Sequence, residues 1–294
     1  MKGKYKIIVD SEYGYVRVDP IPTQEEVEHF YKEEFYSTNA AKFNDSSLEV
    51  QQEEQEFFFS RWELMYKKFS AYYAKKEGLS LFDIGFGFAQ ALLFFKDKGI
   101  EVSGLEPSPE GVDFARSKGL NVFECGIEDL SCVGDRRFDI VTVLNVLEHL
   151  RNPVEIIKDI KAKLLKPGGM LIIDVPNEFN DLQNIANEEY GLNEWWVCPP
   201  AHINYFSSSS IQQVLRRCGY SIWDYQSSFP LELFMLLGDV YVGNNELGKA
   251  CHNKRVHFEY LMRKHKKEDK LYQFYKALAD LNLGRDIVVF AIAE

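Results

Sequence analysis

Two glycines and an acidic residue have the spacing found in sites that bind a nucleoside. The apolar run Leu79–Ile84 has the length of a buried parallel strand. Gly85 and Gly87 follow it, and a backbone without Cβ atoms can turn tightly and approach a ligand closely. Glu106 ends the next apolar segment about 20 residues later, where a carboxylate can accept hydrogen bonds from two ribose hydroxyls. The spacing predicts a nucleoside site, with a plain strand-to-helix connection as the alternative.

Two further positions narrow the class of ligand. Asp83 stands two residues before the first glycine, where a carboxylate would repel a pyrophosphate and attract an ammonium group. Gln90 occupies the position that a dinucleotide-binding fingerprint reserves for its third glycine. The pattern therefore disfavours a nicotinamide oxidoreductase.

Several segments together resemble one enzyme family. Asp83–Ala89 resembles motif I of class I S-adenosylmethionine (SAM) methyltransferases, D-x-G-x-G-x-[GA], and Glu106 resembles the acid of motif II. Phe138–Leu150 resembles motif IV with the turn that follows it, and Leu164–Gly169 resembles the family's later glycine turn. The resemblance covers Leu79–Val175 in the family's order. It implies a Rossmann-like α/β fold, SAM as cofactor and S-adenosylhomocysteine as product, and it is almost silent about the methyl acceptor.

The resemblance also assigns the cofactor contacts. Gly85 and Gly87 would approach the methionine part of SAM, and Glu106 would hold its ribose. Ile127 and Glu128 stand where the family packs adenine and bonds its amino group, although Glu128 could instead belong to a solvated loop. The full predicted cofactor set is Asp83, Gly85, Gly87, Glu106, Pro107, Ile127, Glu128 and Asn145.

Glu148 and His149 directly follow motif IV. In ubiquinone-biosynthesis O-methyltransferases and in the enzymes that methylate small-RNA 3′ ends, an E-x-x-E-H motif supplies ligands to a divalent ion. Asn145 replaces the first acid here, and a hard cation with one carboxylate fewer binds less tightly. We therefore predict no metal site and expect the pair to pack beneath the cofactor.

His202 lies in the aromatic-rich segment Glu194–Ser207, between two prolines and the start of a helix. A neutral imidazole can take the proton of a hydroxyl acceptor, which contributes about 10²–10⁴-fold to the rate. The P-x-H-x-x-Y-F-S pattern also resembles a broad bacterial methyltransferase group related to the ubiquinone enzymes. We predict His202 as the catalytic base, with a structural histidine as the alternative. The predicted substrate contacts are Asn177, Trp196 and Tyr205.

Composition excludes several other classes. The 294 residues carry a net charge of −11, which disfavours nucleic-acid binding because that requires a basic surface. The five cysteines are scattered without a C-x-x-C pair, so we expect neither a disulfide framework nor a zinc site, and we expect a cytoplasmic protein. No segment approaches the about 20 apolar residues of a transmembrane helix. The oligomeric state is not indicated.

The elements that must position these residues alternate between strand and helix. This alternation predicts a seven-stranded, mostly parallel sheet with helices on both faces, the last two strands being Tyr220–Tyr225 and Asp286–Ile292. Before the core we expect a hairpin within residues 4–19, a helix capped by Thr23 and Glu26, a mobile polar segment at Asn39–Ser47, and a long helix over Glu49–Glu77.

The predicted organisation has an N-terminal cap, a core and a helical insertion. Within the insertion, the segment Lys249–Lys270 contains eight Lys or Arg residues but only three acidic residues. A solvated helix explains this excess, and attraction of an anionic acceptor or of an anionic membrane is the alternative. The predicted parts are a hairpin and helical cap that also covers the cofactor (1–77), the SAM-binding core (78–225), a helical insertion that acts as a substrate lid (226–285) and the final core strand (286–294).

The sequence thus predicts a methyltransferase that acts on a hydroxyl of a small molecule or sugar. Methylation of a nitrogen or carbon atom, on a nucleotide-sugar or another anionic metabolite, is one alternative. A SAM-binding protein without turnover is the other.

Overall fold

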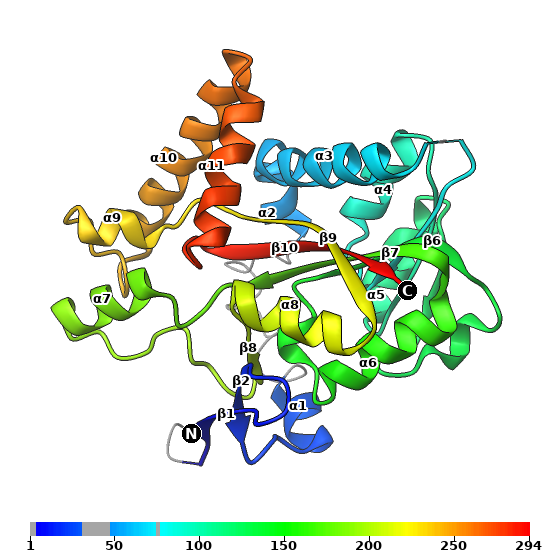
Figure 1. Cartoon of the computed structure of the whole chain (residues 1–294), viewed down its shortest axis with the longest axis horizontal. Coiled ribbons are helices and arrows are strands. Elements are labelled where there is room, and N and C mark those ends of the chain that lie inside the picture. The colour runs from blue at the N-terminus through cyan, green and yellow to red at the C-terminus, as the bar shows by residue number, and fades with distance from the viewer. Residues whose placement is uncertain (1–3, 31–47, 75–76) are drawn as a thin grey trace.

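A seven-stranded sheet forms the centre of the computed structural model, which describes residues 4–30, 48–74 and 77–294 (Figure 1). The strand order is β5-β4-β3-β6-β7-β10-β9, and only β10 runs antiparallel to its neighbours. This confirms the predicted fold class. The strands are β3 Ser80–Ile84, β4 Glu101–Glu106, β5 Asn121–Glu124, β6 Phe138–Leu144, β7 Leu165–Pro176, β9 Tyr220–Ser227 and β10 Asp286–Ala293.

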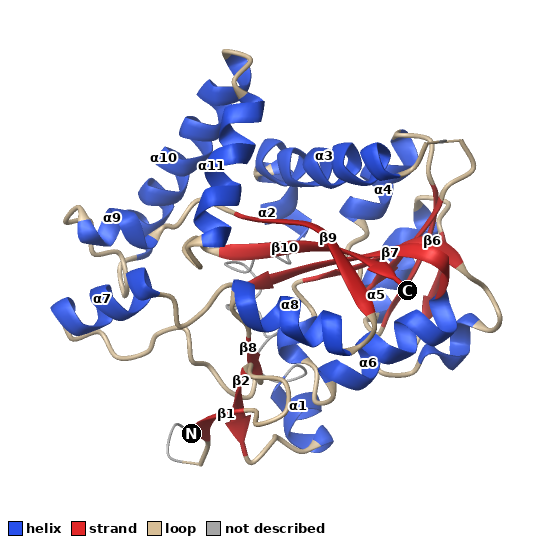
Figure 2. Ribbon diagram, in the orientation of Figure 1, coloured by secondary structure: helices blue, strands red, loops and turns tan. Residues whose placement is uncertain are grey.

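Helices cover both faces of this sheet, as the alternation predicts (Figure 2). Every residue of β3 is buried, because side chains on both of its faces meet helices. Leu81 packs in the cluster that contains Phe69 and Phe95, and Phe82 packs in the opposite cluster with Ile157. The helices of the two faces are α3 Gln55–Tyr72, α4 Gln90–Asp97 and α5 Pro109–Ser117 on one side, and α6 Pro153–Asp159 and α8 Ser208–Arg217 on the other.

A second, smaller sheet joins the N-terminus to the segment around His202. The predicted hairpin is confirmed as β1 Lys6–Val9 and β2 Val16–Asp19, and β2 also pairs with β8 Asn204–Tyr205. The periodicity of the sequence does not reveal β8 because two residues carry no alternation. The next helix, α1 Gln24–Phe30, has the predicted capping box, in which Thr23 and Glu26 each accept a hydrogen bond from the other's backbone N–H.

The single helix predicted over Glu49–Glu77 is wrong. The chain forms α2 Leu48–Glu53 and α3, and Glu54 at the break contacts His252 Nε2 through Oε2 at 2.9 Å. Tyr73 leaves the helix in an extended conformation. The partner His252 lies far along the chain, so no local pattern predicts the break. Trp62, Met65 and Phe69 are buried, which confirms the packing of the aromatic stripe; the expected mobile segment Asn39–Ser47 lies outside the described residues.

The insertion between β9 and β10 is helical, as predicted. It contains α9 Glu232–Leu236, α10 Asn245–Lys264 and α11 Glu268–Asp280. The apolar face expected on α11 is only half correct, since Leu271 and Leu278 are buried while Phe274 and Leu281 are 40% and 67% exposed. Tyr275 takes the buried place instead because its hydroxyl donates to Glu259 Oε1 of α10 at 2.7 Å. The sequence also missed α7 Asp181–Tyr190.

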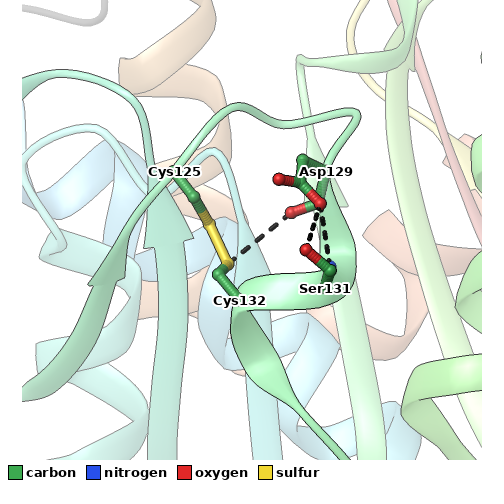
Figure 3. Close-up of a disulfide and its surroundings, with 4 residues drawn as sticks. All are labelled: Cys125, Asp129, Ser131 and Cys132. Atoms are coloured by element: carbon green, nitrogen blue, oxygen red, sulfur yellow. Dashed lines mark hydrogen bonds between the residues drawn. A yellow bond between two sulfur atoms is a disulfide. The ribbon is translucent and has the colours of Figure 1, made fainter.

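Cys125 and Cys132 form a disulfide, which contradicts the expectation that the cysteines are unpaired (Figure 3). Asp129 turns the intervening loop, because its Oδ1 accepts hydrogen bonds from Ser131 N at 3.1 Å and from Ser131 Oγ at 2.6 Å. This side-chain turn brings the two sulfurs together without a C-x-x-C pattern. Cys198, Cys218 and Cys251 are free thiols.

In the described ranges, the helices are all too short or too polar to cross a bilayer.

Candidate cofactor and acceptor site

The glycine turn lies at the carboxyl end of β3, where neighbouring connections leave toward opposite edges of the sheet. Gly85 has φ of +73°, and a Cβ added to it would lie 2.7 Å from Val146 Cγ2 and 3.4 Å from Ile127 Cδ1. A side chain at this position would therefore both strain the backbone and displace Val146. Gly87, with φ of +52°, faces open space, since no atom lies within 4 Å of its ideal Cβ position.

Glu106 is fixed against the glycine turn. Its carboxylate accepts hydrogen bonds from Gly87 N and Ser108 N, both at 2.9 Å, and burial raises its pKa. Each carboxylate oxygen keeps a second lone pair for a ribose hydroxyl. The start of α5 packs closely here, because a Cβ on Gly111 would lie 2.4 Å from the Gly87 carbonyl oxygen. Sequence reasoning missed Gly111, whose role depends on this tertiary contact.

Asp83 points into the sheet. Its Oδ1 accepts a 2.6 Å hydrogen bond from Thr142 Oγ1, and burial raises the pKa of the Asp83 carboxyl to about 7. An ammonium group nearby would stabilise the ionised form and lower that pKa. The predicted contact with the cofactor ammonium stays a prediction.

The other predicted cofactor residues surround the turn. Glu128 is exposed, and its Oε1 accepts hydrogen bonds from Arg151 N at 2.9 Å and Asn152 N at 3.3 Å, just before α6. The carboxylate thus holds the start of a helix, a role that neither sequence alternative foresaw. Asn145, in the left-handed region with φ of 53°, and Pro107 both have exposed side chains at the strand ends.

The three predicted substrate residues, Asn177, Trp196 and Tyr205, are all buried. Asn177 is fully buried, and its Nδ2 donates to the Gly284 carbonyl oxygen at 3.0 Å. Trp196 packs in the apolar cluster of the small sheet, and the Tyr205 hydroxyl donates to the His202 carbonyl oxygen at 2.9 Å. Of these contacts, only that of Tyr205 supports the backbone at His202, and direct substrate contact of all three residues stays a prediction.

The structure brings Glu178 and His202 next to the adjacent pair Glu148 and His149. His202 Nδ1 lies 3.9 Å from Glu178 Oε1, and the His202 and His149 rings have centroids 4.9 Å apart. His149 is oriented by Ala201, whose carbonyl oxygen lies 2.8 Å from Nδ1. One ligand atom each from Glu148, His149 and His202 lies within 4.8 Å of the other two, so the three could hold a cation.

Burial sets the protonation of this cluster. It raises the pKa of Glu178 to about 8 and that of Glu148 well above its usual range. It also lowers the pKa of His202 to about 3, with the neighbouring His149 contributing. In the described part of the chain, Glu148 Oε2 and His202 Nδ1 are buried without a hydrogen-bond partner. Burial therefore holds the two carboxyls toward their protonated forms and holds His202 as a neutral imidazole with a lone pair that can accept a proton.

A buried ion network lies beside this cluster. Arg61 of α3 donates to Asp174 Oδ2 at 2.6 Å and to Asp286 Oδ2 at 3.1 Å. Arg285 contacts Glu232 of the insertion at 2.9 Å. The network ties α3 and the insertion to the strand ends on the acceptor side. Arg61 and Arg285 belong to no motif, so no pattern in the sequence points to them.

Comparison with known families decides between the nucleoside-binding classes. A family model described as a methyltransferase domain matches residues 54–225, which is more than half of the chain. The chain belongs to this methyltransferase family. Membership confirms the resemblance drawn from motifs I, II and IV, and it confirms SAM as the cofactor.

Among its relatives, this methyltransferase is similar to two curated enzymes. It is 30% identical over 140 residues to the ubiquinone biosynthesis O-methyltransferase of Caulobacter vibrioides, a match that covers 43% of this chain and 52% of that protein. It is 28% identical over 163 residues to the mitochondrial enzyme of the same description from Dictyostelium discoideum, over 46% of this chain and 50% of that protein. The chain therefore spans about half the length of the curated relatives it matches.

A solved structure supports the fold of the methyltransferase. A SAM-dependent methyltransferase from Archaeoglobus fulgidus aligns with a TM-score of 0.53 and 19% identity, over 84% of this chain and all of that one (100%). The family match contains the glycine turn, Glu106 and His202, and it ends before the insertion. The open space at Gly87 and the fixed carboxylate of Glu106 fit a bound SAM.

Proposed function

We propose that this methyltransferase transfers the methyl group of SAM to a hydroxyl of a small molecule or sugar, with His202 as the base. The observation that carries the proposal is the neutral His202 imidazole, whose side chain is 22% exposed and whose buried Nδ1 lies beside the Glu178 carboxyl without a hydrogen-bond partner among the described residues. The similarity to ubiquinone biosynthesis O-methyltransferases, over about half their length, supports oxygen as the atom methylated.

Bound SAM would supply an electrophilic methyl group, so the protein's tasks are alignment and proton removal. The acceptor oxygen forms the new O–C bond as the C–S bond breaks, and the electron pair of that bond stays on sulfur. The hydroxyl proton moves to His202. The imidazolium would lower the pKa of the Glu178 carboxyl, 3.9 Å from Nδ1, and the carboxylate formed when that carboxyl loses its proton would stabilise the cation.

A second candidate role for the same cluster is metal binding. Glu148, His149 and His202 would hold a divalent ion through one carboxylate oxygen and two imidazole nitrogens, which suits zinc, iron or manganese better than calcium. The sequence predicted no metal because Asn145 replaces an acid, and it could not foresee that His202 comes close enough to serve as a third ligand. Such an ion would lower the pKa of the acceptor hydroxyl, and His202 would then be a ligand instead of the base.

The helical insertion covers the acceptor side in this proposal. Glu232 of α9 is fully buried and pairs with Arg285, and both interact electrostatically with Glu178. Residues 226–285 would thus act as the lid that encloses the acceptor, while residues 1–77 cap the cofactor.

The experiment measures transfer of labelled methyl from SAM to a metabolite extract, with calorimetry of S-adenosylhomocysteine in parallel. We expect a labelled product with wild type, and a loss of about 100-fold in His202→Ala with cofactor affinity changed less than about threefold. Activity that a chelator abolishes and manganese or zinc restores would assign the cluster to metal. Wild-type rates in His202→Ala would remove it from the mechanism.

The product distinguishes the remaining alternatives. A methylated nitrogen or carbon would overturn O-methylation. Tight cofactor binding without any labelled product would indicate a SAM-binding protein that has lost turnover.

A further inference from the structure

A helical hairpin formed by α10 and α11 projects from the sheet (Figure 1). Helices α10 and α11 lie side by side, and residues 265–267 connect them at the top of the view. The 13 residues of α11 extend for about 20 Å, so the connecting turn stands well clear of the strands. The family match ends before this hairpin, so the methyltransferase fold does not account for it.

The basic residues of this hairpin fall into two groups. Two of them are paired with acids, Lys254 with Asp239 at 2.6 Å and Arg263 with Glu259 at 3.4 Å. At the tip, no acidic group within the described residues forms an ion pair with the exposed lysines, which are Lys264, Lys266, Lys267 and Lys270. Residues 264–270 hold four lysines and two acids, Asp269 and Glu268, and Glu268 pairs with Lys67 of α3 at 2.7 Å. The tip therefore keeps a net positive charge on a chain whose net charge is −11.

The turn itself holds a lysine where glycine would fit better. Lys267 N donates to Met262 O at 2.8 Å and Lys266 N donates to Arg263 O at 2.9 Å, which are the two bonds of a Schellman motif. Lys266 has φ of 56°, a conformation that glycine adopts at lower cost than lysine. A non-glycine residue at this position costs conformational free energy, so the presence of lysine is not explained by stability.

Exposed apolar side chains lie about one helical turn from the lysines along α10 and α11. Leu261 is 38% exposed and Tyr260 is 41% exposed in the last turns of α10, and Phe274 is 40% exposed in the second turn of α11. Lys264 Nζ lies 5.6 Å from the centre of the Tyr260 ring. Leu261 and Lys264 are spaced i, i+3 on α10, and Lys270 and Phe274 are spaced i, i+4 on α11, so each apolar side chain shares a helix face with a lysine. A hairpin that lies along an anionic bilayer can therefore place lysines at the headgroups and apolar side chains in the interface.

We propose that this basic tip, Lys264–Lys270 with Leu261 and Phe274, docks on the surface of an anionic lipid bilayer. The hairpin lies along the bilayer, so the lysines extend their side chains to phosphate and acidic headgroups while the apolar side chains beside them enter the interface. Binding of a nucleic acid would explain the lysines but not the exposed aliphatic side chain of Leu261. A chain with a net charge of −11 would also repel a nucleic acid that extends beyond the tip. The inference is independent of the acceptor and of His202.

The test is co-sedimentation of the full chain with vesicles of phosphatidylcholine that contain about 30 mol% phosphatidylglycerol, compared with pure phosphatidylcholine. We expect binding to the anionic vesicles that weakens steeply between about 50 and about 500 mM salt. The variant Lys264→Glu/Lys266→Glu/Lys267→Glu should lose at least about tenfold in apparent affinity. Lys266→Gly should bind more weakly and also raise Tm by about 1–2 °C, because glycine relieves the backbone conflict.

The matched control reverses the charge of the same number of lysines at positions outside the hairpin. Lys6→Glu/Lys118→Glu/Lys163→Glu replaces three exposed lysines outside the hairpin and should bind within about twofold of wild type. S-adenosylhomocysteine binding by every variant verifies that it is folded. Equal binding to neutral and anionic vesicles, no vesicle binding at all, equal losses in the two triple variants, or tip-dependent binding of single-stranded RNA without vesicle binding would each overturn the proposal.

Discussion

The imidazole Nδ1 of His202 and the carboxyl Oε1 of Glu178 lie 3.9 Å apart, and both side chains are largely buried. His202 precedes β8 of the small sheet, and Glu178 follows β7 of the large one. Two backbone bonds hold this arrangement, since Ile203 N donates to Glu148 O at 2.8 Å and Glu178 N donates to Phe206 O at 3.0 Å. The two sheets therefore meet at the proposed catalytic pair.

Glu178→Gln should lower the rate of methyl transfer by about 10–100-fold without changing cofactor affinity. The amide keeps the size of the side chain but cannot carry the charge that stabilises an imidazolium. Transfer from labelled SAM measures the rate, and calorimetry measures the affinity. Asp181→Asn, an exposed acid at the start of α7, is the matched control. An unchanged rate in Glu178→Gln would show that the proximity is only structural.

Gly85→Ala should weaken S-adenosylhomocysteine binding by at least about tenfold. The new Cβ would lie 2.7 Å from Val146 Cγ2 and would push the turn away from its present path. Gly99→Ala is the control, because Gly99 also has positive φ but its added Cβ meets no atom within 4 Å. In the double variant Gly85→Ala/Val146→Ala we expect part of the affinity to return. Calorimetry that finds equal affinities in all variants would contradict the placement of the cofactor.

Asp83 should make the protein less stable as pH rises from about 4 to about 7. Its pKa in the folded state is raised to about 7, so over this range the folded protein binds more protons than the unfolded chain. The contribution to the slope reaches about −1.4 kcal/mol per pH unit and ends above the folded pKa. Urea unfolding at several pH values should show a flatter profile for Asp83→Asn, whose amide oxygen can still accept from Thr142. Parallel profiles would show that Asp83 does not titrate in this range.

Arg61→Met should destabilise the protein by about 3–5 kcal/mol, because it leaves Asp174 and Asp286 buried without their shared cation. Arg61→Met/Asp174→Asn should recover part of that loss, since the amide carries no charge to desolvate. Urea unfolding monitored by circular dichroism measures both variants. A loss below about 1 kcal/mol for the single variant would mean that solvent reaches the two carboxylates.

The disulfide should protect two thiols from alkylation. Without reduction, denatured protein should react at Cys198, Cys218 and Cys251 only, and after reduction at all five cysteines. Mass spectrometry of the alkylated peptides counts the modified residues. Alkylation of Cys125 and Cys132 before reduction would show that they are free thiols.

The sequence by itself determined the class of cofactor and the glycine turn that is predicted to hold it. The path of the chain through Gly85 and Gly87 follows from backbone freedom within a few residues, and the bounds of β4, β5 and β6 follow from local apolar periodicity. Glu106 could be assigned because the length of one βα unit fixes where the next strand ends. The turn, the strand bounds and the position of Glu106 depend on residues close together in the chain, so they can be predicted from the sequence.

Only the tertiary structure decided the acceptor half. His149 and His202 meet because the small sheet carries the second histidine back over the strand ends, and Arg61 finds Asp174 and Asp286 on other elements. Glu128 binds a helix start for the same reason. A charge buried in a protein needs a partner, but any of many distant residues can supply it, and the choice depends on how the loops run. Sequence periodicity predicts which face of a helix or strand is apolar, but it does not predict the path of the loops that bring distant residues together.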